Sequence, residues 1–320
     1  MEKGKKLVVM IPAYNEERTI YQVVREIPRK IPGISKVDVL VCNDGSRDRT
    51  VEFARAAGAK IFSLPVNKGL GVIFRKGLEI ALNMGADIIT NIDADRQFNP
   101  NDIPRVIRPI VDDMADVVLG SRFLGRHAPR GMPLLKKIGN KMFVNMINNL
   151  AKKNFSDTQC GFRAYSRDAI LKMNLLGDFT HTHETLLEAI NKNLRIREIP
   201  VQVVYRRKRR SRMAASLPRY GIRAMGLMMR TFRDHKPLKF FGLPGLFVFG
   251  LGFLGALYSF IYWLVTSTTS AIQTLFTVSM LFLIIGFLVI VLAMLADMFR
   301  RVKINQEEVL YRLKKSNYKK

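Results

Sequence analysis

Short apolar runs alternate with amphipathic segments along residues 1–205. Patterns typical of buried strands, rich in Val and Ile, occur at residues 6–11, 37–42, 59–64, 87–92 and 115–120. Helical patterns lie between them, at residues 17–26, 47–57 and 69–84. This alternation predicts an α/β fold, an open and mostly parallel sheet with helices on both faces. In such a sheet ligands bind beyond the carboxyl ends of the strands, so functional residues are expected there.

Two further elements are predicted after residue 122. Residues 195–205 predict a last strand, and residues 134–153 predict a helix. A stripe of apolar side chains on this helix is typical of a helix lying on a membrane surface. An ordinary core-facing helix has the same pattern, so both interpretations stay open. The stripe consists of Leu135, Ile138, Met142, Met146 and Leu150.

The chain carries no charged residue between Phe240 and Ala296. A spanning helix needs about 20 apolar residues, so this stretch predicts two transmembrane helices, at about 240–265 and 275–296. Tyr258, Tyr262 and Trp263 lie near one end of the first, where aromatic rings favour the membrane interface. Lys and Arg flank only the outer ends of the pair. The positive-inside rule therefore predicts a multi-pass protein of the cell membrane with both termini and the N-terminal domain in the cytoplasm. A buried helical hairpin is the alternative.

The net charge of +26 indicates an anionic partner or surface. Residues 206–239 hold twelve Lys and Arg against one acidic residue, Asp234. Because this basic segment directly precedes the first predicted span, it is expected to bind anionic lipid headgroups rather than nucleic acid. Four regions follow: an N-terminal α/β domain at 1–205, a juxtamembrane segment at 206–239, a membrane hairpin at 240–296 and a basic tail at 297–320. Only Cys42 and Cys160 are present, which fits a reducing compartment, and no signal peptide is visible.

Two carboxylates, Asp93 and Asp95, come directly after the apolar run at 87–92. An Asp-x-Asp pair at the end of a buried strand can share a divalent cation. Mg²⁺ takes one or two carboxylates and fills its remaining positions with water and substrate phosphate. Such a cation bridges a diphosphate and offsets charge on a leaving nucleoside diphosphate. Taken alone, however, Asp-x-Asp is as typical of a solvated turn or a helix cap.

The strand ends as a set resemble the family 2 glycosyltransferases of the GT-A fold. More narrowly, they resemble dolichyl- or polyprenyl-phosphate glycosyltransferases of the dolichol-phosphate-mannose synthase type. The resemblance covers about residues 7–165. It rests on the motifs IPAYNEE (11–17), CNDGSRDRT (42–50), NKGLG (67–71), DADRQ (93–97), GSRF (120–123) and DTQCGFRAY (157–165).

The resemblance implies a role for particular residues. On the donor side, the nucleotide pocket would be lined by Pro12, Tyr14 and Glu16, the base would meet Asp44, and the nucleotide-sugar would meet Asp93 and Ala94. The cofactor, Mg²⁺ or Mn²⁺, would bind Asp95 with Gln97. The acceptor or sugar phosphate would face Arg122, and further acceptor-phosphate candidates are Arg130, Arg163, Ser211 and Arg212. The family usually has Asp where this chain has Asn43, which leaves the choice between UDP and GDP open with a lean to UDP.

The acceptor follows from motifs that this sequence lacks. Family members that glycosylate hydroxyl groups need a general base, because a hydroxyl is a poor nucleophile near neutral pH. They commonly have Glu-Asp at a helix start and a later Gln-x-x-Arg-Trp. Here the corresponding helix begins with His183-Glu184, and Trp263 is the sole Trp. A lipid monophosphate is already largely ionised and needs cations rather than a base, so dolichyl or polyprenyl phosphate is the expected acceptor.

Several alternatives remain at this stage. One is transfer to a hydroxyl acceptor, as in glycan or glycolipid elongation. Another is a catalytically inactive, membrane-tethered scaffold, and a homo-oligomer is compatible with either. Glu184 would orient the acceptor or only begin a helix, and His181 with His183 would be weak candidates for a metal.

Overall fold

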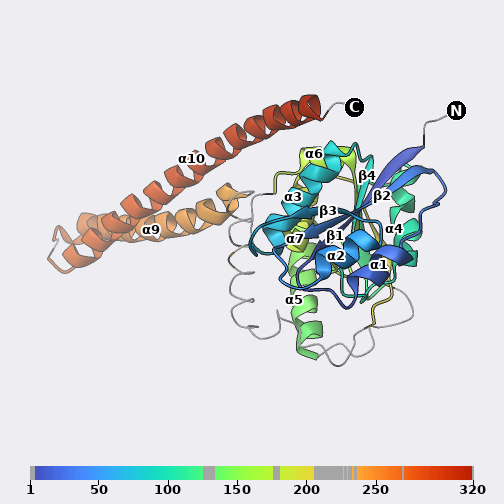
Figure 1. The fold of residues 1–320 in the computed structure, drawn as a ribbon. Helices are drawn as coiled ribbons and strands as arrows, with labels where there is room; N and C mark the ends of the chain where they lie inside the picture. Colours follow the sequence, from blue (N-terminus) through green and yellow to red (C-terminus); the bar gives the residue numbers. More distant parts are fainter. Residues whose placement is uncertain are drawn as a thin grey trace. The chain divides into compact units, whose positions relative to one another are not determined.

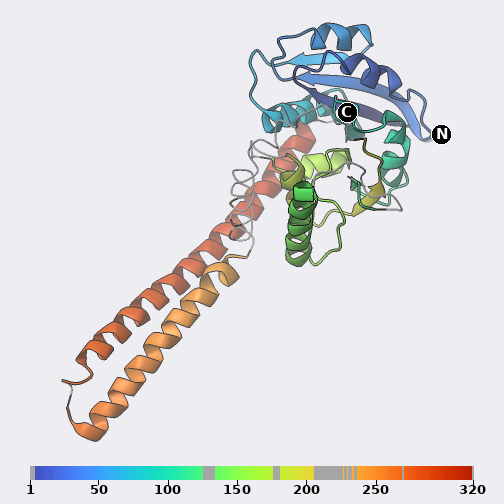
Figure 2. The same cartoon turned by 90° about the horizontal axis from the view of Figure 1, so that it is seen from below.

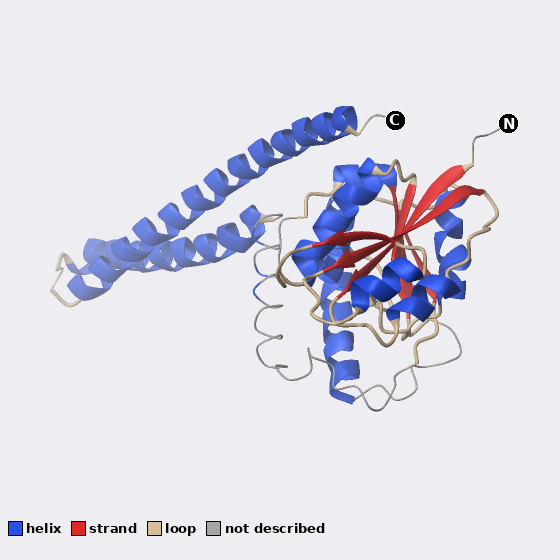
Figure 3. Cartoon of the chain, in the orientation of Figure 1, coloured by secondary structure: helices blue, strands red, loops and turns tan. Residues whose placement is uncertain are grey.

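A computed structural model describes residues 4–124, 134–175, 181–204, 226, 229, 233, 236–268 and 270–318. These residues fall into two compact units, Met1–Arg209 with Leu310–Lys320, and Arg210–Val309. Figures 1 and 3 show the sheet and helices of the first unit and the long helices of the second. Arg130, Ser211 and Arg212 lie outside the described residues, and so does nearly all of the predicted juxtamembrane segment.

The first unit is built on a seven-stranded sheet of order β3-β2-β1-β4-β6-β5-β7. Only β6 runs antiparallel to its neighbours, β4 and β5. The prediction of an open, mostly parallel sheet is therefore confirmed. The strands are β1 (Lys5–Ala13), β2 (Ile34–Asn43), β3 (Lys60–Ser63), β4 (Ile88–Asn91), β5 (Val117–Ser121), β6 (Arg163–Ser166) and β7 (Ile196–Pro200).

Helices cover both faces of this sheet. Alternation along β1 explains the two layers, because Leu7, Val9 and Ile11 join one buried cluster while Val8 and Met10 join the other. The first cluster includes residues of α1 (Ile20–Glu26), α2 (Thr50–Ala56) and α4 (Ile103–Val111), which follows the short helix η1 (Pro100–Asp102). The second includes residues of α3 (Leu70–Asn83), α5 (Leu134–Ala151), α6 (Arg167–Lys172) and α7 (His181–Asn191).

The helix predicted at 134–153 is present as α5, but a different face meets the core. Asn140, Val144 and Ile147 are buried at 3%, 8% and 1% exposure. Met142, from the predicted stripe, is 64% exposed. The other members of the stripe have no described side chains. Among the side chains of α5 that the structure describes, Asn140, Val144 and Ile147 therefore face the core, and Met142 does not.

The second unit contains two helices that are long and apolar enough to cross a membrane, α9 (Leu243–Thr266), preceded by a π-helical turn η3 (Leu238–Gly242), and α10 (Gln273–Asn317). They run side by side in both Figures 1 and 2. Small residues seven apart form the buried seam, which allows the two backbones to approach closely. The seam consists of Gly245, Gly252 and Ser259 on α9 and Ser279, Gly286 and Ala293 on α10.

The end of α10 belongs to the first unit. Tyr311 Oη donates to Asp168 Oδ1 at 2.7 Å, and Lys314 Nζ donates to the carbonyl of Met173 at 3.0 Å and to Asn174 Oδ1 at 2.7 Å. The segment that we predicted as a basic tail, 297–320, is thus helical up to Asn317, and its last turns pack on α6 and the residues that follow it.

Candidate active site

The predicted motifs meet at one edge of the sheet. In the parallel register, Ala13 at the end of β1 pairs with Asn43 at the end of β2, and Met10 pairs with Asn91 at the end of β4. The residues after these strands therefore emerge together, as expected for parallel strands. They include Tyr14 and Glu16, which are partly exposed, and Ala94, which is buried at 4% exposure; Pro12, also partly exposed, is the next-to-last residue of β1.

A tight turn after β4 brings Asp95 and Gln97 into contact. Asp95 Oδ2 accepts from Gln97 Nε2 at 2.6 Å, and Asp95 Oδ1 accepts from the Gln97 amide at 3.1 Å. The turn lies between two supports. Ile92 N donates to the Met10 carbonyl at 3.1 Å before it, and Val204 N donates to the Gln97 carbonyl at 3.0 Å after it.

Asp93 lies beside this turn in a cluster of negative charge. Burial, together with the negative charges of Asp95 and Glu16, raises the pKa of Asp93 to about 7, against the opposing charge of Arg122. Gly161 leaves space for the carboxylate, since a Cβ there would lie 3.2 Å from Asp93 Oδ2.

The donor set of this turn fits a hard divalent cation. Two carboxylates that repel one another gain from a shared cation, and an amide oxygen adds a neutral ligand. Among the described residues no group of three or more His, Cys, Asp and Glu gathers into a metal site. A cation held by Asp95 and Gln97, with Asp93 beside it, would keep positions for water and phosphate.

The loop after β1, which is predicted to line a nucleotide pocket, is joined to the loop after β2 by hydrogen bonds between backbone and side chains. Asn15, at a φ of 54°, donates its amide to Ser46 Oγ at 2.9 Å and accepts from the Arg47 amide at 2.9 Å. The Glu16 amide donates to Thr50 Oγ1 at 2.8 Å. The motifs 11–17 and 42–50 thus form one unit that positions Tyr14 and Glu16.

Asp44 has a structural role that its sequence motif did not indicate. It is 4% exposed, and its two oxygens accept from the amides of Lys68 and Gly69 at 2.8 and 2.9 Å. Asp44 therefore fixes the loop that leads into α3, and its predicted contact with a base stays a prediction. Asn43 is also used internally, since it accepts from the Ser46 amide at 3.0 Å and donates to Ser63 Oγ at 3.2 Å.

Arg122 is held in place by Asp157. Its Nε and Nη2 donate to the two oxygens of Asp157 at 2.6 and 2.9 Å, and its amide donates to Asp157 Oδ2 at 3.1 Å. Asp157 is completely buried. Behind it, Glu198 accepts from the amides of Ser156 and Asp157 at 2.9 and 3.1 Å, and burial raises the pKa of Glu198. The Asp in DTQCGFRAY was a visible signal for this ion pair, whereas Glu198 had none.

The structure contradicts the prediction that Arg163 meets an acceptor phosphate. Arg163 has no exposed surface, because it lies on β6 inside the core. Its guanidinium donates to the carbonyls of Cys160 and Thr158 at 2.9 and 2.8 Å and to Thr185 Oγ1 at 2.8 Å. Arg163 therefore ties β6 to the start of α7.

The two histidines of α7 are core residues. The ring of His181 stacks on Phe74 with 4.4 Å between centroids, and the ring of His183 lies 5.0 Å from that of Phe143. Burial lowers their pKa values to about 3 and about 4, with the charge of Arg163 adding to the effect. This environment favours neutral, packed imidazoles, and the weak metal interpretation finds no support in it.

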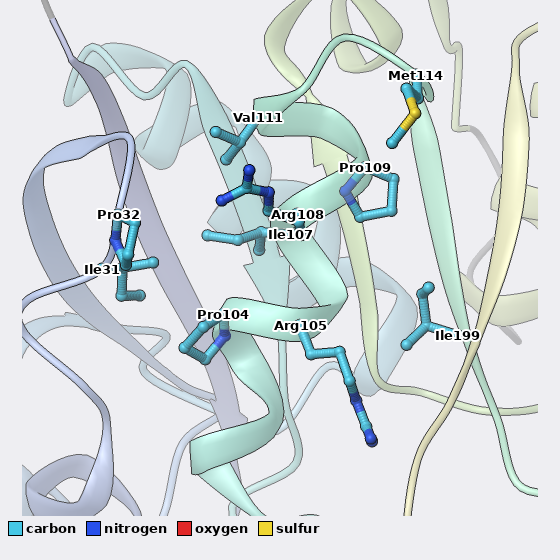
Figure 4. Close-up of a pocket in the computed structure, with 10 residues that line it drawn as sticks. All are labelled: Ile31, Pro32, Pro104, Arg105, Ile107, Arg108, Pro109, Val111, Met114 and Ile199. Atoms are coloured by element: carbon cyan, nitrogen blue, oxygen red, sulfur yellow. The ribbon is translucent and has the colours of Figure 1, made fainter.

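One apolar depression lies away from these strand ends (Figure 4). Its lining comes mainly from α4 and from the loop before β2, and it contains none of the predicted site residues. The lining residues are Ile31, Pro32, Pro104, Arg105, Ile107, Arg108, Pro109, Val111, Met114 and Ile199.

Known proteins share the arrangement. The model of Glycosyl transferase family 2 matches residues 8–173. The UDP-N-acetylglucosamine–dolichyl-phosphate N-acetylglucosaminyltransferase of Methanococcus voltae is 31% identical over 63% of this chain and 86% of its own. The dolichyl-phosphate hexose transferase of Haloferax volcanii is 29% identical over 61% of this chain and 81% of its own.

A solved structure has the same fold. It is glucosyl-3-phosphoglycerate synthase from Mycobacterium tuberculosis in complex with Mn²⁺, UDP-glucose and phosphoglyceric acid. It superposes with a TM-score of 0.55 at 21% identity, over 68% of this chain and 77% of that one. The family match covers more than half of this chain and includes every strand end described above. This chain belongs to glycosyl transferase family 2.

Proposed function

We propose that this glycosyltransferase moves a sugar from a nucleotide-diphospho-sugar to the phosphate of a dolichyl or polyprenyl lipid. The observation that carries the proposal is the strand-end edge itself. There Asp93, Asp95 and Gln97 offer oxygen ligands. Arg122 lies close enough for its positive charge to lower the pKa of Asp93. The Methanococcus voltae relative is named for transfer to dolichyl phosphate, and the Mycobacterium tuberculosis neighbour binds Mn²⁺ and UDP-glucose.

On the donor side, Asp95 and Gln97 would hold Mg²⁺ or Mn²⁺, which when bound neutralises charge on the departing nucleoside diphosphate. Glu16 and Tyr14 stand on the adjoining loop, where a nucleotide would lie, with Pro12 at the end of β1 and Ala94 beside Asp93. We keep a UDP donor as the first choice and GDP as the second.

On the acceptor side, an oxygen of the lipid phosphate attacks the anomeric carbon. The bond from that carbon to the diphosphate breaks, and the nucleoside diphosphate leaves with the electron pair. A single displacement inverts the anomeric centre, so an α-linked donor would give a β-linked product. Arg122 supplies a guanidinium that matches phosphate geometry. Arg130, Ser211 and Arg212 remain candidates for further contacts.

The hairpin would bring this site to its lipid. Helices α9 and α10 have the length and composition to cross a membrane. Lys and Arg flank only the outer ends of the pair, so the positive-inside rule puts both ends of the hairpin on the cytoplasmic side. With the basic segment 206–239 beside anionic headgroups, we propose an enzyme of the cell membrane whose catalytic unit and termini face the cytoplasm.

Transfer of radiolabelled sugar into an organic-extractable lipid tests the proposal. Purified full-length protein in detergent receives dolichyl or undecaprenyl phosphate, Mn²⁺, and UDP-N-acetylglucosamine, UDP-glucose or GDP-mannose in parallel. We expect one donor to label the lipid, with the signal lost in Asp95→Ala. The signal should persist in Asp113→Ala, which removes a carboxylate whose side chain is 85% exposed. Nucleotide binding without any labelled lipid would refute the acceptor and favour a hydroxyl acceptor.

A further inference from the structure

Arg96 stands in the middle of the metal-binding turn in a conformation that L-residues rarely adopt. Its φ is 59°, in the left-handed region, where a long side chain is disfavoured. Such a residue persists only where its surroundings hold it. The chain reverses at Arg96, and the side chains of its two neighbours meet, with 2.6 Å between Gln97 Nε2 and Asp95 Oδ2.

The side chain of Arg96 supplies one of these restraints. Its guanidinium forms an ion pair with Glu26 Oε1 at 2.5 Å and also donates to Gln22 Oε1. Gln22 and Glu26 are four residues apart and therefore lie on one face of α1. A planar guanidinium with a fork of donors can bind both at once, which an ammonium group does less well. The turn is thus attached to a helix that lies seventy residues away in the sequence.

Residues 203–204 form a second attachment of the turn. Phe98 forms an antiparallel bridge with Val203, and the Gln97 carbonyl accepts from Val204 N. Helix α1 is itself connected to the nucleotide loop, because its first amide, that of Ile20, donates to the Glu16 carbonyl at 3.0 Å. The turn that holds Asp95 and the loop that holds Glu16 therefore meet through α1.

We propose that Arg96 is a positioning residue that clips the metal-binding turn to α1 and so keeps Asp95 and Gln97 arranged for the cation and the donor. The inference rests on the proposed function, because it assigns the turn to a divalent cation. Without the clip, the left-handed conformation loses one of its supports. The apo turn then populates arrangements in which Asp95 and Gln97 are apart, and binding must restore the proper one.

Titration calorimetry of full-length protein in detergent measures the affinity of the site for the cation. Mn²⁺ is titrated into protein saturated with UDP, and with GDP in a separate arm. Arg96→Ala is expected to raise the Kd for Mn²⁺ about fivefold, the upper range for an ion pair with this exposure. Glu26→Ala, which changes only α1, is expected to act in the same direction. The double variant should be no worse than Arg96→Ala alone, because both changes remove one interaction. Arg96→Lys should rescue part of the loss.

Two further readouts separate positioning from general stability. Hydrogen exchange of residues 93–98 without ligand should be faster in Arg96→Ala, while the Tm changes little. In the transfer assay the KM for the nucleotide-sugar should rise and the KM for the lipid phosphate should not. The matched control is Lys76→Ala, which breaks an exposed ion pair with Glu79 at 2.8 Å on α3 and should leave every value unchanged.

The outcomes distinguish the two proposals. If wild-type protein fails to bind Mn²⁺ in both the UDP arm and the GDP arm, the assignment of a cation to the turn is refuted, and the positioning role of Arg96 is refuted with it. If wild-type protein binds Mn²⁺ but Arg96→Ala and Glu26→Ala bind it equally well, only the positioning role is refuted, and the proposed function stands.

Discussion

Replacing Asp157 by Asn tests whether Arg122 is preorganised by a buried ion pair. Asp157 binds Arg122 through Nε, Nη2 and the backbone amide, and the side chains are 0% and 12% exposed. Asn keeps the size and one acceptor but removes the charge. The guanidinium then remains in a partly buried place with one hydrogen bond fewer and no counter-charge from this neighbour.

The cost follows from burial. Removing one partner of a buried pair typically destabilises by about 3–5 kcal/mol. Because Arg122 keeps some contact with water and Asn keeps one acceptor, we expect about 2–3 kcal/mol. For a catalytic unit of this size, this corresponds to a fall in Tm of roughly 5–10 °C. The KM for the lipid phosphate should rise more than the KM for the nucleotide-sugar, since Arg122 is expected to face the acceptor.

Asp116→Asn provides a matched control. Asp116 binds Arg195 by the same three donors, Nε, Nη2 and the backbone amide, at 3.2, 3.0 and 2.8 Å. There, however, the arginine is 50% exposed, and a solvent-exposed pair contributes at most about 1 kcal/mol. Thermal unfolding followed by circular dichroism compares the two variants with wild type. If Asp157→Asn costs no more than Asp116→Asn, burial does not set the strength of the pair and our reasoning is wrong.

Two further predictions concern the core and the hairpin. Burial lowers the pKa of His181 to about 3. Between pH 6.5 and pH 3 the unfolded chain therefore binds more protons at this site than the folded chain. The free energy of unfolding decreases as the pH is lowered, by about 2 kcal/mol at pH 5. His181→Phe should lose less stability between pH 7 and pH 5 than wild type in urea unfolding, and equal losses would contradict the prediction. A Cβ at Gly286 would lie 2.4 Å from Phe249 N, whereas one at Gly250 would meet nothing within 4 Å. Gly286→Leu should therefore expose the turn between α9 and α10 to proteolysis while Mn²⁺ and UDP affinity is unchanged, and Gly250→Leu should not. Equal cleavage of the two variants would show that the seam does not hold the helices together.

The sequence was sufficient for the parallel strands and for the edge where the motifs meet. Five apolar runs predicted five strands, because a strand buried on both faces leaves a continuous apolar signal. The one strand missed there, β6, lies inside the DTQCGFRAY motif and carries the buried charge of Arg163. A charged residue at a core position hides a strand from hydropathy. The same charge favoured Arg163 as a phosphate ligand, although its guanidinium donates to the carbonyls of Cys160 and Thr158 and to the hydroxyl of Thr185.

Pairings between distant loops were beyond the sequence. Ser46 directly precedes the helix predicted at 47–57, yet its hydroxyl accepts from the Asn15 amide, and α2 begins only at Thr50. Asp44, which is predicted to contact a base, also accepts hydrogen bonds from the amides of Lys68 and Gly69, and this second role was not predicted. Each of these side chains has several hydrogen-bond donors within reach in the folded chain, and spacing along the sequence does not determine which of them it binds. The same limit concealed Glu198, which acts on Asp157 across 41 positions.

The position of Val204 connects the charge of the chain to its chemistry. Val204 N bonds to the carbonyl of Gln97, and the basic run 206–212 starts two residues later. Charge that only served to attract a membrane could begin anywhere between the catalytic unit and α9. In the sequence it begins two residues after Val204, which contacts the turn that we propose to hold the cation. We therefore predict that the basic run acts on phosphate groups at the proposed site as well as on headgroups, over a range of about 8 Å at physiological ionic strength. A lipid phosphate that reaches the site from the membrane would depend on both of these interactions, because the segment would bind the membrane surface and also attract the phosphate of the acceptor.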